Sequence, residues 1–303
     1  MSFLLLSVVL CFLSVSVAMF TSIGLPLLVL LPAPLALAVQ RKGVPAAILA
    51  IIPGLLAVGR LYPDLWPPML GIILLGIYLG WEISMDIEPS NILWQGTIFA
   101  AGLFLLWIAW SMHQGNSIIS LWTKQLDIYM KPENLPYLQA FDAEERLQMF
   151  SDLKRTILEI YPSLLLIYLT VLVAVNLWLT RKLLPSFGGG LKPYLPFEFW
   201  RITYPVVWGV IIGILFVFAG IEWNRAALHM LGVNLFISFS LPYLICGLGI
   251  ISLQLRRMQA GDLLRRLLLL LCILQPLLIQ AALWLGIFDT WCDFRKLEAL
   301  KES

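Results

Sequence analysis

Uncharged polar side chains interrupt several long apolar runs of this sequence, and their amide and hydroxyl groups could bind a small polar ligand. Pro242 and Pro276 lie near some of them in two successive runs. Because proline interrupts helical hydrogen bonds and frees backbone carbonyls, paired breaks of this kind build solute sites in transporters. We therefore expect a substrate-binding site near the two prolines. The side chains expected to converge there are Asn234, Tyr243 and Gln275, with Asn176 as a further candidate.

The same amides have a structural interpretation. A buried amide in lipid must find a hydrogen-bond partner, and its commonest role is to join two helices, which stabilises them by about 0.6 kcal/mol per bond. The sequence alone leaves both interpretations open.

A second polar group follows the last apolar run, in the segment GIFDTWCDFRK. Residues four apart share one face of a helix, if the helix continues through this segment. These residues are candidates for a gate or a partner-docking patch. The alternative is a tryptophan anchor at the membrane interface beside a salt-bridged helix end. The pairs four apart are Asp289 with Asp293 and Trp291 with Arg295.

Motifs for catalysis or metal binding are missing from the sequence. His113 and His229 are the only histidines, and neither H-E-x-x-H, G-x-S-x-G, a Walker lysine nor C-x-x-C occurs. No charged residue lies well inside an expected span, which argues against an intramembrane enzyme and a proton-coupled carrier. The sequence predicts no enzymatic activity, no cofactor and no metal. Four cysteines without paired spacing are expected to pack as small apolar residues: Cys11, Cys246, Cys272 and Cys292.

The composition is that of a polytopic membrane protein. Of 303 residues, 60% are hydrophobic and 13% are charged, and the mean hydropathy is +0.90. Soluble domains contain about a quarter charged residues, so one soluble core could not bury this much apolar surface. The net charge of +2 gives no indication of a nucleic-acid partner. The lipid bilayer is the expected environment.

The apolar runs predict an all-α bundle of about eight or nine transmembrane helices in a single integral membrane domain, residues 1–303. The central run, 228–257, is expected to bend at Pro242. The run 2–20 has no basic start or clear cleavage site and is expected to remain as a helix. The proline-rich run 24–40 is expected inside the bundle. The other spans are expected at 44–59, 65–81, 94–110, 158–180, 202–220 and 267–286.

A polar insertion at about 113–157 separates the spans. Its periodicity predicts two surface helices, and the second begins with an N-cap at Asp142. The insertion is either an interfacial element that docks to lipid or a partner, or a connector that rests on the end of the bundle.

Basic residues next to the spans predict the topology. The positive-inside rule places Arg41–Lys42, Arg181–Lys182 and Arg256–Arg257 in the cytoplasm. Counting spans onward places residues 289–303 outside. That tail contains three basic and four acidic residues, so the rule does not decide its side.

Four segments together resemble the YybS-like family of bacterial polytopic membrane proteins: GLPLLVLLPAPLALAVQRKG, FEFWRITYPVVWGV, GVNLFISFSLPYLICGLGII and GIFDTWCDFRK. That family is distantly similar to the S-components of energy-coupling factor transporters. The resemblance implies a multi-pass protein of the bacterial inner membrane that binds a small solute and docks onto a partner permease. Because the chain has no ATPase motif, energy would come from a partner ATPase or another membrane subunit. The alternative hypothesis is a non-transporting scaffold or assembly factor that acts through partner proteins.

Overall fold

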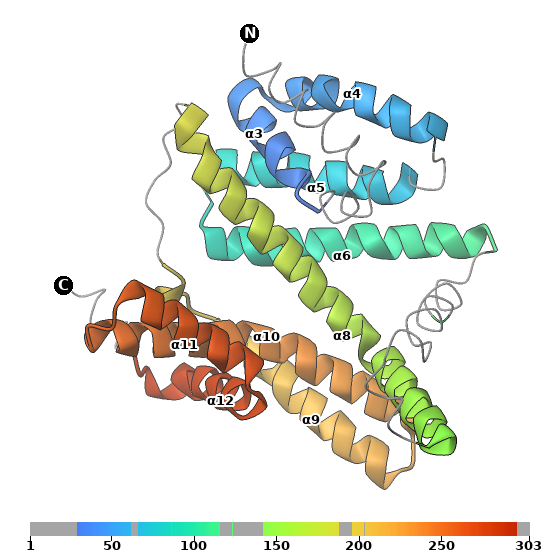
Figure 1. Ribbon diagram of the computed structural model, residues 1–303, viewed down its shortest axis with the longest axis vertical. Helices are drawn as coiled ribbons and strands as arrows, with labels where there is room; N and C mark the ends of the chain where they lie inside the picture. The colour runs from blue at the N-terminus through green and yellow to red at the C-terminus, as the bar shows by residue number, and fades with distance from the viewer. Residues whose placement is uncertain are drawn as a thin grey trace. The chain divides into compact units, whose positions relative to one another are not determined.

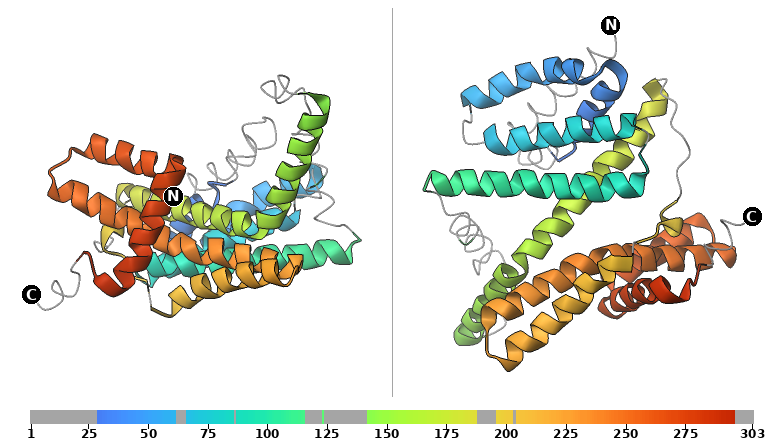
Figure 2. Two further views of the ribbon diagram at one scale, coloured as in Figure 1. Left: turned by 90° about the horizontal axis from the view of Figure 1, so that it is seen from below. Right: turned by 180° about the vertical axis from the view of Figure 1, so that it is seen from behind.

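The computed structural model describes residues 29–61, 66–85, 87–115, 123, 142–187, 196–202 and 204–295. Within these ranges the chain forms nine α-helices, three short 3-10 helices and no strand (Figures 1 and 2), which confirms the all-α fold class. Helices satisfy their backbone groups internally, as lipid demands. The chain divides into two compact units, residues 1–154 with 168–193, and residues 155–167 with 194–303. The single integral membrane domain stays a prediction.

The first unit contains the proline-rich segment at its centre, as predicted. Helix α3 begins at Pro32, and most of its residues are buried. It packs on α5, where a Cβ at Gly76 or Gly80 would lie within 2.8 Å of an α3 side chain. The small residues therefore let the two backbones approach closely. The helices of this unit are α3 (Pro32–Lys42), α4 (Val44–Leu61), α5 (Trp66–Ser84), α6 (Pro89–His113) and the later part of α8 (Ala143–Leu183).

In the second unit α9 and α10 lie side by side and antiparallel (Figure 1). Gly213 of α9 and Gly232 of α10 each abut the backbone of the other helix. Helix α12 crosses α10 at Gly247 and Gly286, where an added Cβ would overlap a backbone carbonyl of the facing helix. The elements are α9 (Val207–Glu222), α10 (Ala226–Arg257), α11 (Asp262–Leu274) and α12 (Pro276–Cys292), with 3-10 turns at Phe197–Phe199 and Tyr204–Val206. A further 3-10 turn, Leu184–Phe187, follows α8 in the first unit.

Two sequence-based boundaries were wrong. The bend expected at Pro242 stays a prediction, since Pro242 lies inside the continuous helix α10. The expected single span 267–286 is two helices, because α11 and α12 meet at a bend of 100° at Pro276. The expected surface helix after Asp142 and the following span form one helix, α8, of 41 residues. Asp142 is the N-cap residue of α8 but makes no side-chain capping bond. The first expected surface helix lies almost entirely outside the described residues.

The described helices make this a multi-pass membrane protein. Four of them are long and apolar enough to cross a bilayer, and there are five if the bent pair α11–α12 is counted as one span. Large apolar side chains cover their outer faces; Ile98 and Leu106 of α6 are 71% and 68% exposed. Such surface is suited to acyl chains and unsuited to water. The run 2–20 lies outside the described residues.

Candidate functional site

A cavity of about 130 Å³ lies in the second unit, where α10, α12 and the segment before α9 meet. Polar and apolar groups share its lining. From α10 come Tyr243 and Cys246, and α12 gives Gly286, Asp289 and Thr290. The segment before α9 gives Arg201, Ile202 and Tyr204, and the turn after α12 gives Asp293 and Arg295.

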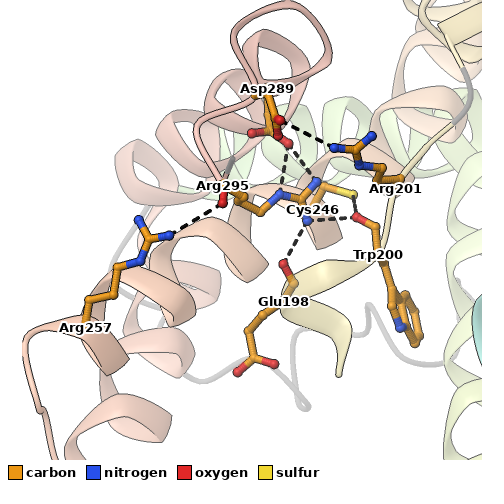
Figure 3. Close-up of polar contacts among 8 residues, drawn as sticks. Glu198, Trp200, Arg201, Cys246, Arg257, Asp289 and Arg295 are labelled. Atoms are coloured by element: carbon orange, nitrogen blue, oxygen red, sulfur yellow. Dashed lines mark hydrogen bonds and ion pairs between the residues drawn. The ribbon is translucent and has the colours of Figure 1, made fainter. Parts of the chain in front are cut away.

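Arg295 is the best-connected residue of this site (Figure 3). Its Nε and Nη2 donate to Oδ2 of Asp289 at 3.0 and 2.6 Å. Its Nη1 donates to the backbone carbonyls of Glu198 and Trp200 at 2.9 and 2.8 Å. The Arg295 side chain is only 3% exposed. The planar guanidinium therefore joins α12 to the segment before α9.

A sharp turn at the end of α12 aims Arg295 into the site. Helix α12 ends at Cys292, and Asp293 adopts the left-handed conformation with φ of 40°. Aspartate tolerates this region better than most residues do. The condition for the four-apart pairs, a helix that continues through Arg295, is therefore not met. Arg295 pairs with Asp289 six positions earlier, and the expected face shared by Trp291 and Arg295 does not form.

Two residues of the cavity lining each have a buried side-chain atom without a hydrogen-bond partner among the described residues. These atoms are Oδ1 of Asp289 and the hydroxyl of Tyr243. The Asp289 side chain is 6% exposed, and Tyr243 is 1% exposed. The Thr290 side chain lies next to the Tyr243 hydroxyl and can exchange a hydrogen bond with it. Because buried polar groups almost always have partners, the Asp289 carboxylate oxygen in particular needs a physical explanation.

The surrounding contacts hold the site's backbone in place. The Ser252 hydroxyl of α10 donates to Oε1 of Glu198 at 3.0 Å, and both residues are buried. The Cys246 thiol donates to the Trp200 carbonyl at 3.4 Å. Arg201 and Asp293 form an ion pair at 3.4 Å that is more exposed than the Asp289–Arg295 pair. The lining thus has two arginines and two aspartates, whose formal charges cancel.

Asn234 lies elsewhere in this unit. It is about 14 Å along the axis of α10 from Tyr243, because nine residues separate them at 1.5 Å each. Its Oδ1 accepts from the backbone N–H of Ser163 at 3.0 Å and from the Ser163 hydroxyl. Its Nδ2 donates to the carbonyls of Glu159 and Met230 at 2.7 and 2.9 Å. The Asn234 amide is therefore fully used in joining α10 to α8.

The other two substrate-binding candidates do not line the cavity either. Asn176 belongs to the first unit, where its amide bonds Ala33, Val29 and Leu172. Gln275 stands at the bend between α11 and α12 with an exposed side chain. The predicted convergence of Asn234, Tyr243 and Gln275 is therefore absent from the structure, and Tyr243 alone lines the cavity.

Three of the four residues in the candidate gate or docking patch line the cavity: Asp289, Asp293 and Arg295. The fourth, Trp291, is exposed and packs edge-on against Tyr204 with ring centroids 6.2 Å apart. Sequence reasoning missed Glu198 and Arg201, which contact the cavity's charged residues or line it. A usable signal was present, because both are charged residues that flank Trp200 in a short segment directly before a span.

The helical architecture, apolar outer faces and interior polar site define the class of multi-pass α-helical membrane proteins. Within it, the chain belongs to the family described as "Predicted membrane protein (DUF2232)", which matches residues 5–290. No curated protein and no solved structure matches the chain.

Proposed function

We propose that this protein is a solute-binding subunit of a transport system in the bacterial inner membrane, similar in role to the S-components of energy-coupling factor transporters. A partner permease or ATPase supplies the energy. The role is binding, without catalysis and without a cofactor, and the solute occupies the cavity lined by Tyr243, Asp289 and Arg295.

The observation that supports this proposal best is the pair of unpartnered buried atoms, Asp289 Oδ1 and the Tyr243 hydroxyl. An unpaired buried polar group costs about 1–3 kcal/mol, and more if it is charged. Arg295 does not relieve the cost of these unpaired atoms, because its guanidinium already donates to Asp289 Oδ2 and to two backbone carbonyls. A solute with an N–H or O–H donor would satisfy Oδ1 of Asp289.

The size and charge of the cavity restrict the solute. About 130 Å³ is below the roughly 300–1,000 Å³ of clefts that hold drug-sized ligands. The two arginines and two aspartates cancel, so a neutral or zwitterionic molecule fits without leaving a net buried charge. The proposed solute is therefore a small polar molecule that donates hydrogen bonds.

Native mass spectrometry of the detergent-extracted protein tests the proposal. Wild-type protein is expected to retain a small molecule that Thr290→Phe loses, because the larger side chain fills the cavity from α12. Gln280→Phe is the matched control, since Gln280 is an exposed residue of the same helix. A wild-type protein without any bound small molecule, or a bound molecule that Thr290→Phe retains, would contradict the proposal.

A scaffold or assembly factor is the second candidate, and the length of α8 favours it. Forty-one residues at 1.5 Å each extend about 62 Å, twice the roughly 30 Å of a hydrocarbon core. The first turns therefore reach beyond the bilayer, with Glu144 and Glu145 exposed. Under this hypothesis Glu144→Lys/Glu145→Lys abolishes co-purification of a membrane partner, and Thr290→Phe leaves that co-purification unchanged.

A further inference from the structure

The bent pair α11–α12 begins and ends at the same end of α10. Helix α10 terminates at Arg257, and α11 starts only five residues later, at Asp262. After α12 the chain returns, and Nη2 of Arg257 donates to the backbone carbonyl of Arg295 at 3.5 Å. The entry and the exit of the pair are thus both held at the C-terminal end of α10.

Contacts with the segment before α9 confirm this placement independently. Because α9 and α10 are antiparallel, the segment leading into α9 lies beside the C-terminal half of α10, where Glu198 bonds Ser252. The Arg295 guanidinium bonds the carbonyls of Glu198 and Trp200 in that segment. The chain after α12 therefore contacts both the C-terminal end of α10 and the segment before α9, at the same end of the unit.

Helix lengths agree with a pair that does not cross the bilayer. At 1.5 Å per residue, the 13 residues of α11 extend about 20 Å and the 17 residues of α12 about 26 Å. Each is shorter than a hydrocarbon core of about 30 Å. A single broken span would carry Asp262 and Arg295 to opposite faces, which the contact between Arg257 and Arg295 does not allow.

We infer that α11 and α12 form a re-entrant helical pair that enters and leaves the bilayer at the cytoplasmic face, and that the Asp289–Arg295 cavity opens to the cytoplasm. The cytoplasmic side follows from the arginines that flank the entry, since positive charge next to spans marks that face. These are Arg256, Arg257, Arg265 and Arg266. This assigns residues 289–295 to the cytoplasmic side, whereas span counting placed them outside and the charge of the tail did not decide.

The inference goes beyond the proposed function, because it concerns access and holds whether or not a solute binds. It also restricts that function: whatever occupies the cavity, a solute or a group of a partner subunit, reaches it from the cytoplasm.

Thiol labelling tests the topology directly. Cys292 is exposed at the end of α12 and serves as the reporter once Cys11, Cys246 and Cys272 are replaced by serine. A membrane-impermeant maleimide is applied to intact spheroplasts and to inverted membrane vesicles. Phe294→Cys in a background without Cys292 gives a second reporter, since Phe294 is 41% exposed.

Two further single-cysteine variants serve as references for the two faces of the membrane. Gln259→Cys reports the turn after α10, and Asn224→Cys reports the turn between α9 and α10 at its other end. We expect Cys292, Phe294→Cys and Gln259→Cys to react at least tenfold faster in inverted vesicles, and Asn224→Cys in intact spheroplasts.

Reaction of Cys292 or Phe294→Cys together with Asn224→Cys in spheroplasts would overturn the re-entrant pair. Reaction of Gln259→Cys in spheroplasts would overturn the cytoplasmic assignment. If neither Cys292 nor Phe294→Cys reacts in either preparation, although detergent-denatured protein reacts fully, the claim that the cavity opens to the cytoplasm is overturned.

Discussion

The two polar regions on α10 use their hydrogen-bonding groups in opposite ways. Around Asn234, every amide hydrogen bond goes to a neighbouring backbone or hydroxyl group of the same unit. Around Arg295, the guanidinium is fully engaged, yet Asp289 Oδ1 and the Tyr243 hydroxyl are left without partners. The first region is a closed structural joint, and the second is the region in which we propose that an additional molecule binds.

The structural joint has a specific cause in the sequence. In an undisturbed helix the N–H of Ser163 would bond the carbonyl of Glu159, four residues earlier. Pro162 disturbs α8 at this point, and the Asn234 amide bonds both of those backbone groups. The side chain thus substitutes for a hydrogen bond that the proline weakens.

The first unit repeats this arrangement. Asn176 accepts from the N–H of Ala33 and donates to the carbonyl of Val29, again four residues apart and again next to a proline, Pro32. The two sites differ in one respect: α3 begins at Pro32, so Asn176 bonds an N–H of the first helical turn, whereas Asn234 bonds groups inside a helix. The comparison teaches that an amide in an apolar run is best explained by looking for backbone groups next to a proline that lack a helical partner.

Among the variants that test the difference between the two regions, the largest effect is expected at the buried Asp289–Arg295 ion pair. Arg295→Met leaves Asp289 as an uncompensated buried charge and should lower the free energy of unfolding by about 3–5 kcal/mol. Adding Asp289→Leu should restore much of the loss, because no charge is then left unpaired. Equilibrium unfolding in mixed detergent micelles measures both values, with the exposed Arg256→Met as a control that changes stability by less than about 0.5 kcal/mol. A double variant as unstable as Arg295→Met would refute this explanation.

The next effect is expected at the crossing of α10 and α12, which holds the region around Arg295 in place. Gly286→Ala places a Cβ on the carbonyl oxygen of Tyr243, and Gly247→Ala places one on that of Ala282. Backbone oxygens cannot rotate away, so overpacking should destabilise each variant by about 1–3 kcal/mol. Gly102→Ala is the matched control, since Gly102 also lies inside a helix and nothing lies within 4 Å of its added Cβ. Thermal unfolding in detergent measures the series, and equal melting temperatures throughout would refute the close crossing.

The structural joint should respond more weakly. Asn234→Leu removes amide hydrogen bonds worth about 0.6 kcal/mol each in membrane proteins, so a loss of about 1–2 kcal/mol is expected. Retention of a bound small molecule should be unchanged, because Asn234 does not line the cavity. The two measurements are unfolding and native mass spectrometry on the same preparation. Loss of the bound molecule at wild-type stability would return Asn234 to the binding site.

The smallest effect is expected at Gln275. Its side chain is exposed at the bend between α11 and α12, and the structure gives it no side-chain hydrogen bond among the described residues. Gln275→Leu should change the free energy of unfolding by less than about 0.5 kcal/mol and should leave ligand retention intact. A large loss of either property would place Gln275 among the functional residues, as the sequence pattern suggested.

Much of the fold followed from hydropathy, because a lipid environment allows few alternatives to helices. The central run expected at 228–257 is α10, Ala226–Arg257. The boundaries that failed all involve proline, which can end a helix, bend it or be accommodated within it. Pro276 separates two helices, whereas Pro162 and Pro242 lie inside continuous ones. Which outcome occurs depends on neighbouring groups that hydropathy does not reveal.

The site was predictable in part. Tyr243, Asp289, Asp293 and Arg295 were candidates from their types and positions, and they do line one cavity. The pairing of Asp289 with Arg295 was not predictable from helical spacing, because it depends on the left-handed turn at Asp293. The asparagines were ambiguous for a similar reason: their partners outside their own helices lie 71 to 147 residues away in the chain.

An electron cryomicroscopy map of the protein in lipid nanodiscs tests the central claim most directly. The account predicts non-protein density larger than one water molecule, within hydrogen-bond distance of Asp289 Oδ1 and the Tyr243 hydroxyl. A map in which the cavity is closed and a protein group bonds Asp289 Oδ1 would contradict it.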